Sequence, residues 1–363
     1  MWIDEFFELL YSKDSAKIEE AYELKNKKMP DFIYKYKSIT GNGHTFDLLE
    51  NDLIYLSNAN NLNDLYEGEF FYNVEKFFYN NFESKIISDF IKKAKLSDER
   101  LSNSEKPYLE LQKLIYETDP IVNTDIPFEE FNNLSLKIIF DALNKVFQDG
   151  NNISKENTYL TCFSEDFDVI LMWSHYADSN TGICIKYNIK DFEDFIIRAY
   201  YPIKYEEGYT YTEELSNMKE NMHKLMFDPY LRKETTWSYE KEWRILFNHA
   251  ILLKSAIKIG EKYFLKLPKP SAIYLGKRIA AENKEKIIDI CKKREISLYQ
   301  MEKDTRKAKL YETEILKYSE EYWENELFIV ESIKNKTCKS LIHKYFYYSK
   351  SIEDIKKRIF KNY

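Results

Sequence analysis

The sequence has few cysteines and glycines and no long apolar run, and these shortages exclude several classes of protein. No Cys-x-x-Cys pair is present, which argues against a zinc knuckle and against a disulfide framework. The longest apolar run, Val169 to Trp173, is far shorter than the ~20 residues needed to cross a membrane. The N-terminus has neither the basic region nor the apolar core of a secretory signal. We therefore expect a cytoplasmic protein without a membrane partner. The four scattered cysteines are Cys162, Cys184, Cys291 and Cys338.

Motifs for metal binding and for common nucleophiles are also missing. The five histidines, at 44, 175, 223, 249 and 343, lack the spacing of metal ligands. There is no Gly-x-Ser-x-Gly elbow and no evident Cys–His nucleophile pair. The sequence therefore predicts no metal site.

Aromatic residues are plentiful, and charge is unevenly distributed. The chain contains 24 Phe and 30 Tyr, which favours a folded chain that buries them. The net charge is −7, yet residues 334–363 hold nine Lys or Arg against Glu353 and Asp354, a balance of +7. Residues 1–333 therefore carry −14, so an acidic body precedes a basic tail.

Hydrophobic patterns alternate between helix and strand periods and predict an α+β fold. We expect a central mixed or split β-sheet flanked by helices, with an N-terminal helix and a C-terminal helical extension. Residues 1–30 form the N-terminal segment, with a single helix expected over residues 2–28. Residues 31–306 form the α+β domain, and residues 307–363 the extension. A helical insertion is expected at about 73–150. Strands are predicted at 32–36, 53–56, 159–164, 182–187, 201–205, 243–247, 263–267, 272–276 and 296–301.

Several short segments follow one another in a characteristic order across residues 32–302. They are Ile33-Tyr34-Lys35-Tyr36, Leu56-Ser57 followed by Asn63-Asp64-Leu65-Tyr66-Glu67, Thr161-Cys162-Phe163-Ser164, Met172-Trp173-Ser174-His175-Tyr176-Ala177, Gly182-Ile183-Cys184-Ile185, Trp237 through Ile245, and Ile273-Tyr274-Leu275-Gly276. Together they resemble the bacterial domain-of-unknown-function family numbered 2971. Leu65 stands where that family usually has proline.

The layout of that family is distantly similar to ADP-ribosyltransferase-like folds. Those folds carry a basic or aromatic residue on an early strand, a serine ending a middle strand, and a late Glu-x-Glu. Tyr34 or Lys35, then Ser164, then Glu240 with Glu242 stand at these places. The resemblance implies an enzyme acting on a nucleotide-like ligand, an ADP-ribosyltransferase or NAD glycohydrolase with NAD as its substrate. Such an enzyme could serve as a bacterial toxin or an antiviral-defence effector.

The stretch Glu240 to Ile245 carries the strongest chemical signal. In a strand, Glu240, Glu242 and Arg244 would share one face, with Trp243 and Ile245 on the other. One carboxylate could bind a ribose hydroxyl and stabilise oxocarbenium charge, while its neighbour takes a proton from the acceptor. Arg244 could orient the carboxylates or grip phosphate. The alternative is a structural Glu–Arg pair beside a core tryptophan.

A second group of candidates lies on a short helix and in one loop. His175 could act as an acid or base, or simply donate a structural hydrogen bond. The loop residues Asp64 and Glu67 could form turns or face the pocket. We predict Glu242, Glu240 and His175 as catalytic residues. The predicted ligand-binding residues are Arg244, Tyr34, Lys35, Asp64, Glu67, Ser164, Trp173 and Tyr176, with Trp173 expected in the core and Tyr176 able to stack on a ring.

The tail from Lys334 to Tyr363 mixes basic and aromatic residues and offers a competing function. Such a segment can bind single-stranded nucleic acid through charge and stacking. It could equally be a helical cap whose aromatics pack on the body. The chain would then be a non-catalytic module that binds nucleic acid or a protein, or a scaffold within an oligomer.

Overall fold

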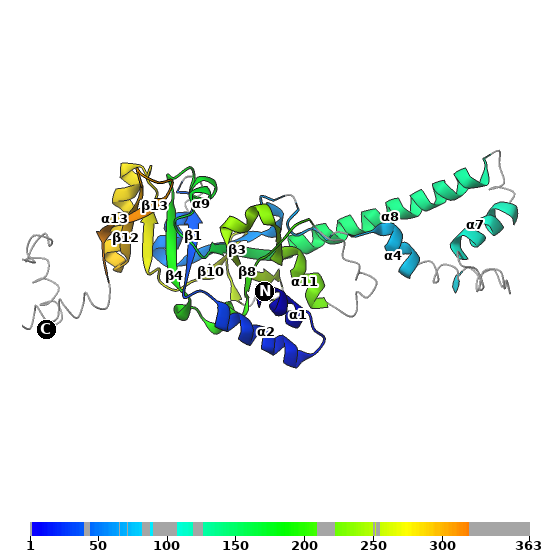
Figure 1. Cartoon of the computed structure of the whole chain (residues 1–363), viewed down its shortest axis with the longest axis horizontal. Coiled ribbons are helices and arrows are strands. Elements are labelled where there is room, and N and C mark those ends of the chain that lie inside the picture. Colours follow the sequence, from blue (N-terminus) through cyan, green and yellow to red (C-terminus); the bar gives the residue numbers. More distant parts are fainter. Residues whose placement is uncertain are drawn as a thin grey trace, which may run out of the picture.

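The computed structural model describes residues 2–39, 44–64, 66–70, 72–81, 88–89, 107–118, 126–208, 222–249, 251 and 255–318. Its centre is a mixed eleven-stranded sheet with helices around it, so the predicted α+β class is confirmed (Figure 1). The order along the sheet is β13-β12-β11-β4-β1-β3-β2-β10-β9, with β8 and β5 branching from β3. Within this sheet β11 and β12 pair in parallel, and the other described pairs are antiparallel.

The strands of the large sheet are β1 (Phe32–Lys37), β2 (Leu53–Asn58), β3 (Thr158–Ser164), β4 (Ile183–Asn188), β5 (Tyr200–Pro202), β8 (Glu242–Asn248), β9 (Ile257–Ile259), β10 (Lys262–Lys266), β11 (Ala272–Leu275), β12 (Ser297–Lys303) and β13 (Leu310–Leu316). A small parallel sheet joins β6 (Lys204–Glu206) to β7 (Arg232–Glu234). The helices are α1 (Trp2–Leu10), α2 (Ser15–Lys28), α3 (His44–Asn51), α4 (Val74–Asn81), α7 (Pro107–Thr118), α8 (Phe128–Glu156), α9 (Ile170–His175), α10 (Asp194–Arg198), α11 (Met222–Leu231) and α13 (Ala281–Arg294), with short 3-10 turns η1 (Ala59–Asn61), η2 (Ile189–Asp191) and η4 (Thr235–Glu240).

Strand β3 is the point at which the sheet divides. One edge of β3 pairs with β8 along its whole length. The opposite edge pairs with β2 at Tyr159 and Leu160 and with β1 at Ser164. Neither β1 nor β2 is paired with residues 161–163, so the two neighbours diverge from β3 there. This divergence creates the space in which the candidate site lies.

Strand β8 supplies apolar side chains to the core. Trp243 and Ile245, which the sequence predicted on one strand face, enter the main apolar cluster together with Phe247. Leu246, on the other face, is buried in a second apolar cluster. The Trp243 ring stacks on Tyr200 at 4.9 Å and on Trp2 of α1 at 6.0 Å. The N-terminal helix is therefore fixed to the sheet through aromatic contacts with the strand that carries Glu242.

Two expectations about helices are wrong. The expected single helix over residues 2–28 is interrupted after Leu10, and Asp14 Oδ1 accepts the amide hydrogen of Ala16 at 2.9 Å to begin α2. The expected helix from residue 307 is replaced at Leu310–Leu316 by β13, which pairs antiparallel with β12. Pairing with the edge of β12 outweighs the weak local preference for helix. The rest of the expected extension, including the basic tail, lies outside the described residues.

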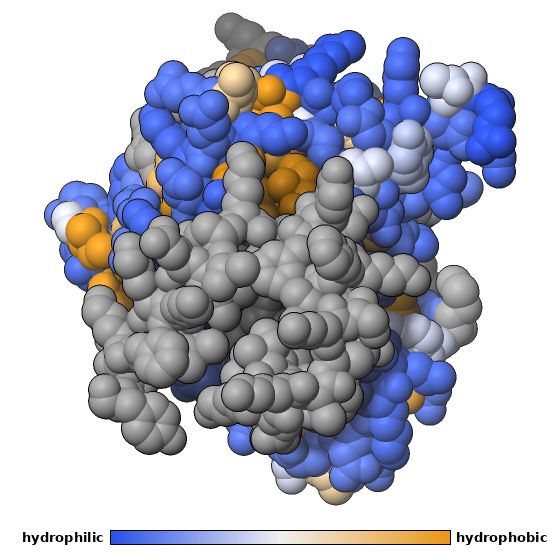
Figure 2. Space-filling model, turned by 90° about the vertical axis from the view of Figure 1, so that its left-hand side faces the viewer, coloured by the Kyte–Doolittle hydropathy of each residue, from blue (hydrophilic) through white to orange (hydrophobic). Residues whose placement is uncertain are grey.

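Helix α8 extends away from the sheet, and α4 and α7 pack against it (Figure 1). The end of the molecule that holds α13, β12 and β13 presents a mainly hydrophilic described surface (Figure 2). Among the helices that the structure describes, none is both long and apolar enough to cross a membrane.

Candidate functional site

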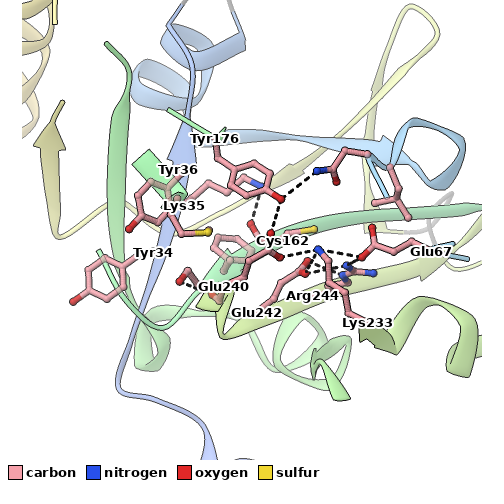
Figure 3. Close-up of a pocket in the computed structure, with 15 residues that line it drawn as sticks. Tyr34, Lys35, Tyr36, Glu67, Cys162, Tyr176, Lys233, Glu240, Glu242 and Arg244 are labelled. Carbon is pink, nitrogen blue, oxygen red and sulfur yellow. Dashed lines mark hydrogen bonds and ion pairs between the residues drawn. The ribbon is translucent and has the colours of Figure 1, made fainter. Parts of the chain in front are cut away.

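A cavity of about 80 Å³ lies where β1 and β2 diverge from β3 (Figure 3). Three strands, the loop after β2, helix α9 and the β7–η4 segment all contribute to its wall. The lining residues are Tyr34, Lys35, Tyr36, Leu62, Asn63, Glu67, Cys162, Phe163, Ser164, Met172, Tyr176, Lys233, Glu240, Glu242 and Arg244. The wall therefore combines aromatic rings with charged groups from distant parts of the chain.

Arg244 holds two of the carboxylates. Its Nε donates to Glu242 Oε1 at 2.7 Å, and its Nη2 donates to Glu242 Oε2 at 2.9 Å. The same Nη2 also donates to Glu67 Oε1. Arg244 is completely buried, and Glu67 and Glu242 are at most 5% exposed. This is a two-pronged arginine–carboxylate pair shielded from water, a geometry that fixes Glu242 in one orientation.

Lys233 on β7 belongs to the same cluster and lies beside Arg244 (Figure 3). Its Nζ donates to Glu240 Oε2 at 2.7 Å and to Glu242 Oε2 at 3.1 Å, and it lies 3.2 Å from Glu67 Oε1. Lys233 is 3% exposed. Three carboxylates thus share two cations, which leaves one negative charge in excess when all five groups are ionised.

Burial and charge move the pKa values of Glu240 and Glu242 in opposite directions. Burial, followed by the charge of Glu242, raises the pKa of Glu240 from 4.5 to about 7. Burial also raises the pKa of Glu242, but the charges of Arg244 and Lys233 outweigh burial and hold that pKa well below its usual range. Near neutral pH the pair therefore offers one carboxyl that exchanges a proton and one that stays ionised, the division of labour that acid–base catalysis uses.

Lys35 is a third cation on the cavity wall. Its Nζ donates to the carbonyl oxygen of Cys162 at 2.7 Å, which is an uncharged partner. Burial lowers the pKa of Lys35. Lys35 therefore compensates the negative excess only in part.

A chain of hydrogen bonds leads from the surface to Glu240. The exposed Asn63 donates its Nδ2 hydrogen to Tyr176 Oη at 3.3 Å. Tyr176 Oη in turn donates to Glu240 Oε1 at 2.6 Å. Tyr176 and Asn63 thus form the part of the wall nearest to solvent, and Tyr176 holds the inner carboxyl in position.

Glu67 presents a buried oxygen with no hydrogen-bond partner. Its Oε2 is inaccessible and unpaired, whereas its Oε1 contacts Arg244 and Lys233. An unpaired buried carboxylate oxygen is costly, so this inaccessible atom adds to the electrostatic cost of the cluster.

Tyr34, Ser164 and Glu242 lie side by side across three neighbouring strands. Tyr34 on β1 is the pairing partner of Ser164 on β3, and Ser164 is the partner of Glu242 on β8. All three line the cavity. Ser164 Oγ donates to the carbonyl oxygen of Glu240 at 2.7 Å and so supports the turn that precedes β8.

Three predicted site residues lie elsewhere. His175 is exposed and does not line the cavity, and its Nδ1 is 3.4 Å from Tyr239 Oη. Trp173 is fully buried in the core, where its Nε1 donates to the carbonyl oxygen of Phe167 at 2.7 Å. Asp64 Oδ1 accepts the amide hydrogen of Tyr66 at 2.9 Å, which is a turn-forming bond.

The expectation that Glu240, Glu242 and Arg244 share one strand face is wrong for Glu240. Glu240 ends the 3-10 turn η4, and Lys241 after it adopts a left-handed conformation with φ 40° and ψ 56°. Alternation applies only to extended backbone, so it begins at Glu242. The two glutamates nevertheless converge, because Lys233 binds both.

Lys233 is the central residue that sequence reasoning missed. It lies on a three-residue strand within Arg232-Lys233-Glu234, which has the composition of an exposed segment. Its strand pairs with β6, with Lys233 opposite Tyr205, and its side chain is buried. Within the described ranges, no group of three or more His, Cys, Asp or Glu residues is arranged to hold a metal ion.

The pKa of Glu240 predicts a specific pH dependence of stability. A carboxyl whose folded pKa exceeds its unfolded pKa stabilises the fold at low pH and loses that contribution as the pH rises through the folded value. We expect the free energy of unfolding of the wild type, relative to Glu240→Gln, to fall by on the order of 1 kcal/mol or more between pH 4.5 and pH 8. Urea denaturation of both proteins across this range measures the difference, and an unchanged difference would contradict the raised pKa.

Comparison with protein-family models matched residues 172–245 to the family described as Protein of unknown function (DUF2971). The resemblance noted in the sequence is thereby confirmed for this segment, which includes Tyr176, Lys233, Glu240, Glu242 and Arg244. Comparison with curated proteins returned no match, and neither did comparison with solved structures.

Proposed function

We propose that the chain cleaves the N-glycosidic bond of NAD, as an ADP-ribosyltransferase or an NAD glycohydrolase, with Glu242 as the principal carboxylate. The bond between C1′ of the ribose and the nicotinamide nitrogen breaks, and nicotinamide leaves with the electron pair. The resulting oxocarbenium ion is captured by water or by an acceptor, which loses a proton. An enzyme of this kind would suit a bacterial toxin or an antiviral-defence effector.

One observation carries this proposal: Tyr34, Ser164 and Glu242 occupy adjacent positions on three neighbouring strands at the cavity wall. The resemblance to ADP-ribosyltransferase-like folds assigns to these residues the early aromatic or basic residue, the serine and the glutamate of those folds. The strands come from residues 32–37, 158–164 and 242–248, so the alignment is a property of the fold and not of local sequence.

The charges of the cluster fit a reaction whose transition state is positive. Glu242 remains ionised because Arg244 and Lys233 lower its pKa. Fixed negative groups in a water-poor pocket stabilise developing positive charge more strongly than water does. Glu240, with its pKa of about 7, can take the proton of the attacking nucleophile.

The cavity is small for a whole dinucleotide. Its volume of about 80 Å³ is below the roughly 300 Å³ at which pockets for drug-sized ligands begin. We therefore propose that only the reacting end of NAD enters, while the adenylate part lies outside the wall formed by Asn63 and Tyr176.

Incubation with NAD tests the proposal. We expect the wild type to release nicotinamide and Glu242→Gln to release it at least about 100-fold more slowly. Glu282→Gln, at an exposed position on α13, serves as the matched control and should keep the wild-type rate. Thermal unfolding of each protein shows whether it is folded. Intact NAD with folded wild-type protein under every condition, or equal rates for folded Glu242→Gln and wild type, would refute the proposal.

A further inference from the structure

Helix α8 has two apolar faces, and one of them has no partner among the described elements. The inner face, with Leu136, Ile139, Phe140 and Leu143, packs against Phe78 of α4 and Tyr108 and Leu111 of α7. The outer face carries large apolar side chains that are half or more exposed: Leu134 at 51%, Ile138 at 62%, Val146 at 65% and Ile153 at 59%. A surface helix normally exposes polar residues on the face away from its core.

The outer face consists of two parallel rows of exposed residues spaced four apart. The apolar row contains Leu134, Ile138, Ala142, Val146 and Gly150. The charged row beside it contains Lys137, Asp141, Lys145 and Asp149, with signs that alternate. Residues four apart lie on one ridge of a helix, and such ridges are the surfaces through which helices pack.

We propose that α8 pairs antiparallel with α8 of a second copy of this chain, about a two-fold axis between Ala142 and Leu143. In this arrangement Ile138 lies within one residue of the level of Val146 of the partner subunit, and Leu134 lies within one residue of the level of the partner's Gly150. The small Ala142 lies at the crossing and meets the partner's Ala142. An added Cβ at Gly150 would have no atom within 4 Å, so there is open space in which the partner's leucine can lie.

The charged row selects this partner and this direction. With the axis between Ala142 and Leu143, Lys137 lies within one residue of the level of the partner's Asp149, and Asp141 lies within one residue of the level of the partner's Lys145. The like charges across the pair are displaced by at least three residues, so each charge in the row is nearest to its opposite. A parallel pair in register would place each charge against its own copy, which is repulsive. Lys137 and Asp141 already form an exposed pair at 2.6 Å within the helix, and both remain close to the proposed partner charges.

The size and shape of α8 suit such a contact. Its 29 residues give a length of about 43 Å, long enough for two helices to cross and still bury the apolar row. Glu130 and Glu156, which bear like charges, lie near the ends of the pair.

Sedimentation equilibrium of the full chain tests the association. We expect a wild-type dimer at micromolar concentration and a dissociation constant at least about 100-fold weaker for the double variant Ile138→Asp, Val146→Asp. The control is Ile257→Asp with Ile259→Asp, which places the same charges on exposed apolar positions of β9. Circular dichroism confirms that each variant is helical. A wild type that stays monomeric at 100-fold higher concentration, or a dimer that folded Ile138→Asp, Val146→Asp does not weaken, would overturn the proposal.

Cysteine crosslinking tests the direction of pairing. In the antiparallel dimer Ala142→Cys places two thiols at the axis, and oxidation should yield a covalent dimer above the wild-type background. Ile153→Cys lies on the same face, but the antiparallel arrangement separates it from its copy by about 33 Å, far beyond disulfide distance. Crosslinking of both variants, or of Ile153→Cys alone, would contradict the antiparallel geometry.

Discussion

We expect replacement of Arg244 with methionine to lower the free energy of unfolding by about 3 to 5 kcal/mol. Arg244 is fully buried and is bound to Glu242 through two nitrogens and to Glu67 through one of them. Methionine keeps much of the packing volume but removes the positive charge. Two carboxylates would then lie in an environment without water, with Lys233 as their main cation. Either one of them takes up a proton, or the site opens to solvent.

The matched control is Arg198→Met. Arg198 also forms a two-pronged pair with a glutamate, Glu19, but that pair is exposed to solvent. Exposed pairs contribute little, so urea denaturation should show almost no change for this variant. If Arg244→Met lowers the free energy of unfolding no more than Arg198→Met does, the buried cluster does not depend on its cations.

Replacement of Lys233 with methionine should lower the free energy of unfolding by about as much as Arg244→Met does. Lys233 lies within 3.2 Å of all three carboxylates, and it is the group whose charge permits Glu240 and Glu242 to approach each other. Burial lowers the pKa of Lys233, but Glu242, Glu67 and Glu240 outweigh burial and raise it, so the ammonium is charged at neutral pH. Its removal leaves three carboxylates with a single cation, Arg244.

A double variant separates charge from packing. Glu240→Gln removes one of the three carboxylates, so adding it to Lys233→Met should restore at least about 1 kcal/mol of the lost stability at pH 7.5. At pH 5 Glu240 is already protonated in the wild type, so adding Glu240→Gln to Lys233→Met should restore less stability than at pH 7.5. If the changes in the free energy of unfolding caused by Lys233→Met and Glu240→Gln simply add at both pH values, the charge balance described for the cluster is wrong.

Much of the fold could be predicted from the sequence because the strands carry clear period-two patterns. Trp243, Ile245 and Phe247 entered the core as alternation requires. The same rule placed Glu242 and Arg244 on the opposite face, and they bind each other there. Residue types and spacing within one strand are local properties, so one sequence sufficed to predict them.

The rest of the site depends on long-range structure. Lys233 is buried because a three-residue strand pairs with β6, and no local pattern announces that pairing. Glu240 leaves the expected strand because Lys241 adopts a left-handed conformation, which is uncommon for a residue other than glycine. The cavity itself exists because β1 and β2 diverge from β3, a feature of the sheet rather than of any one segment.

We propose that the cavity at the branch of β3 receives the reacting end of NAD. Crystals of the wild-type protein soaked with NAD would test this most directly. We expect new density for the ribose and its leaving group inside the cavity, beside Glu242 and Tyr34. NAD bound at another surface while the cavity stays unchanged, with Glu242 contacting only Arg244 and Lys233, would contradict the claim and leave the cluster a purely structural role.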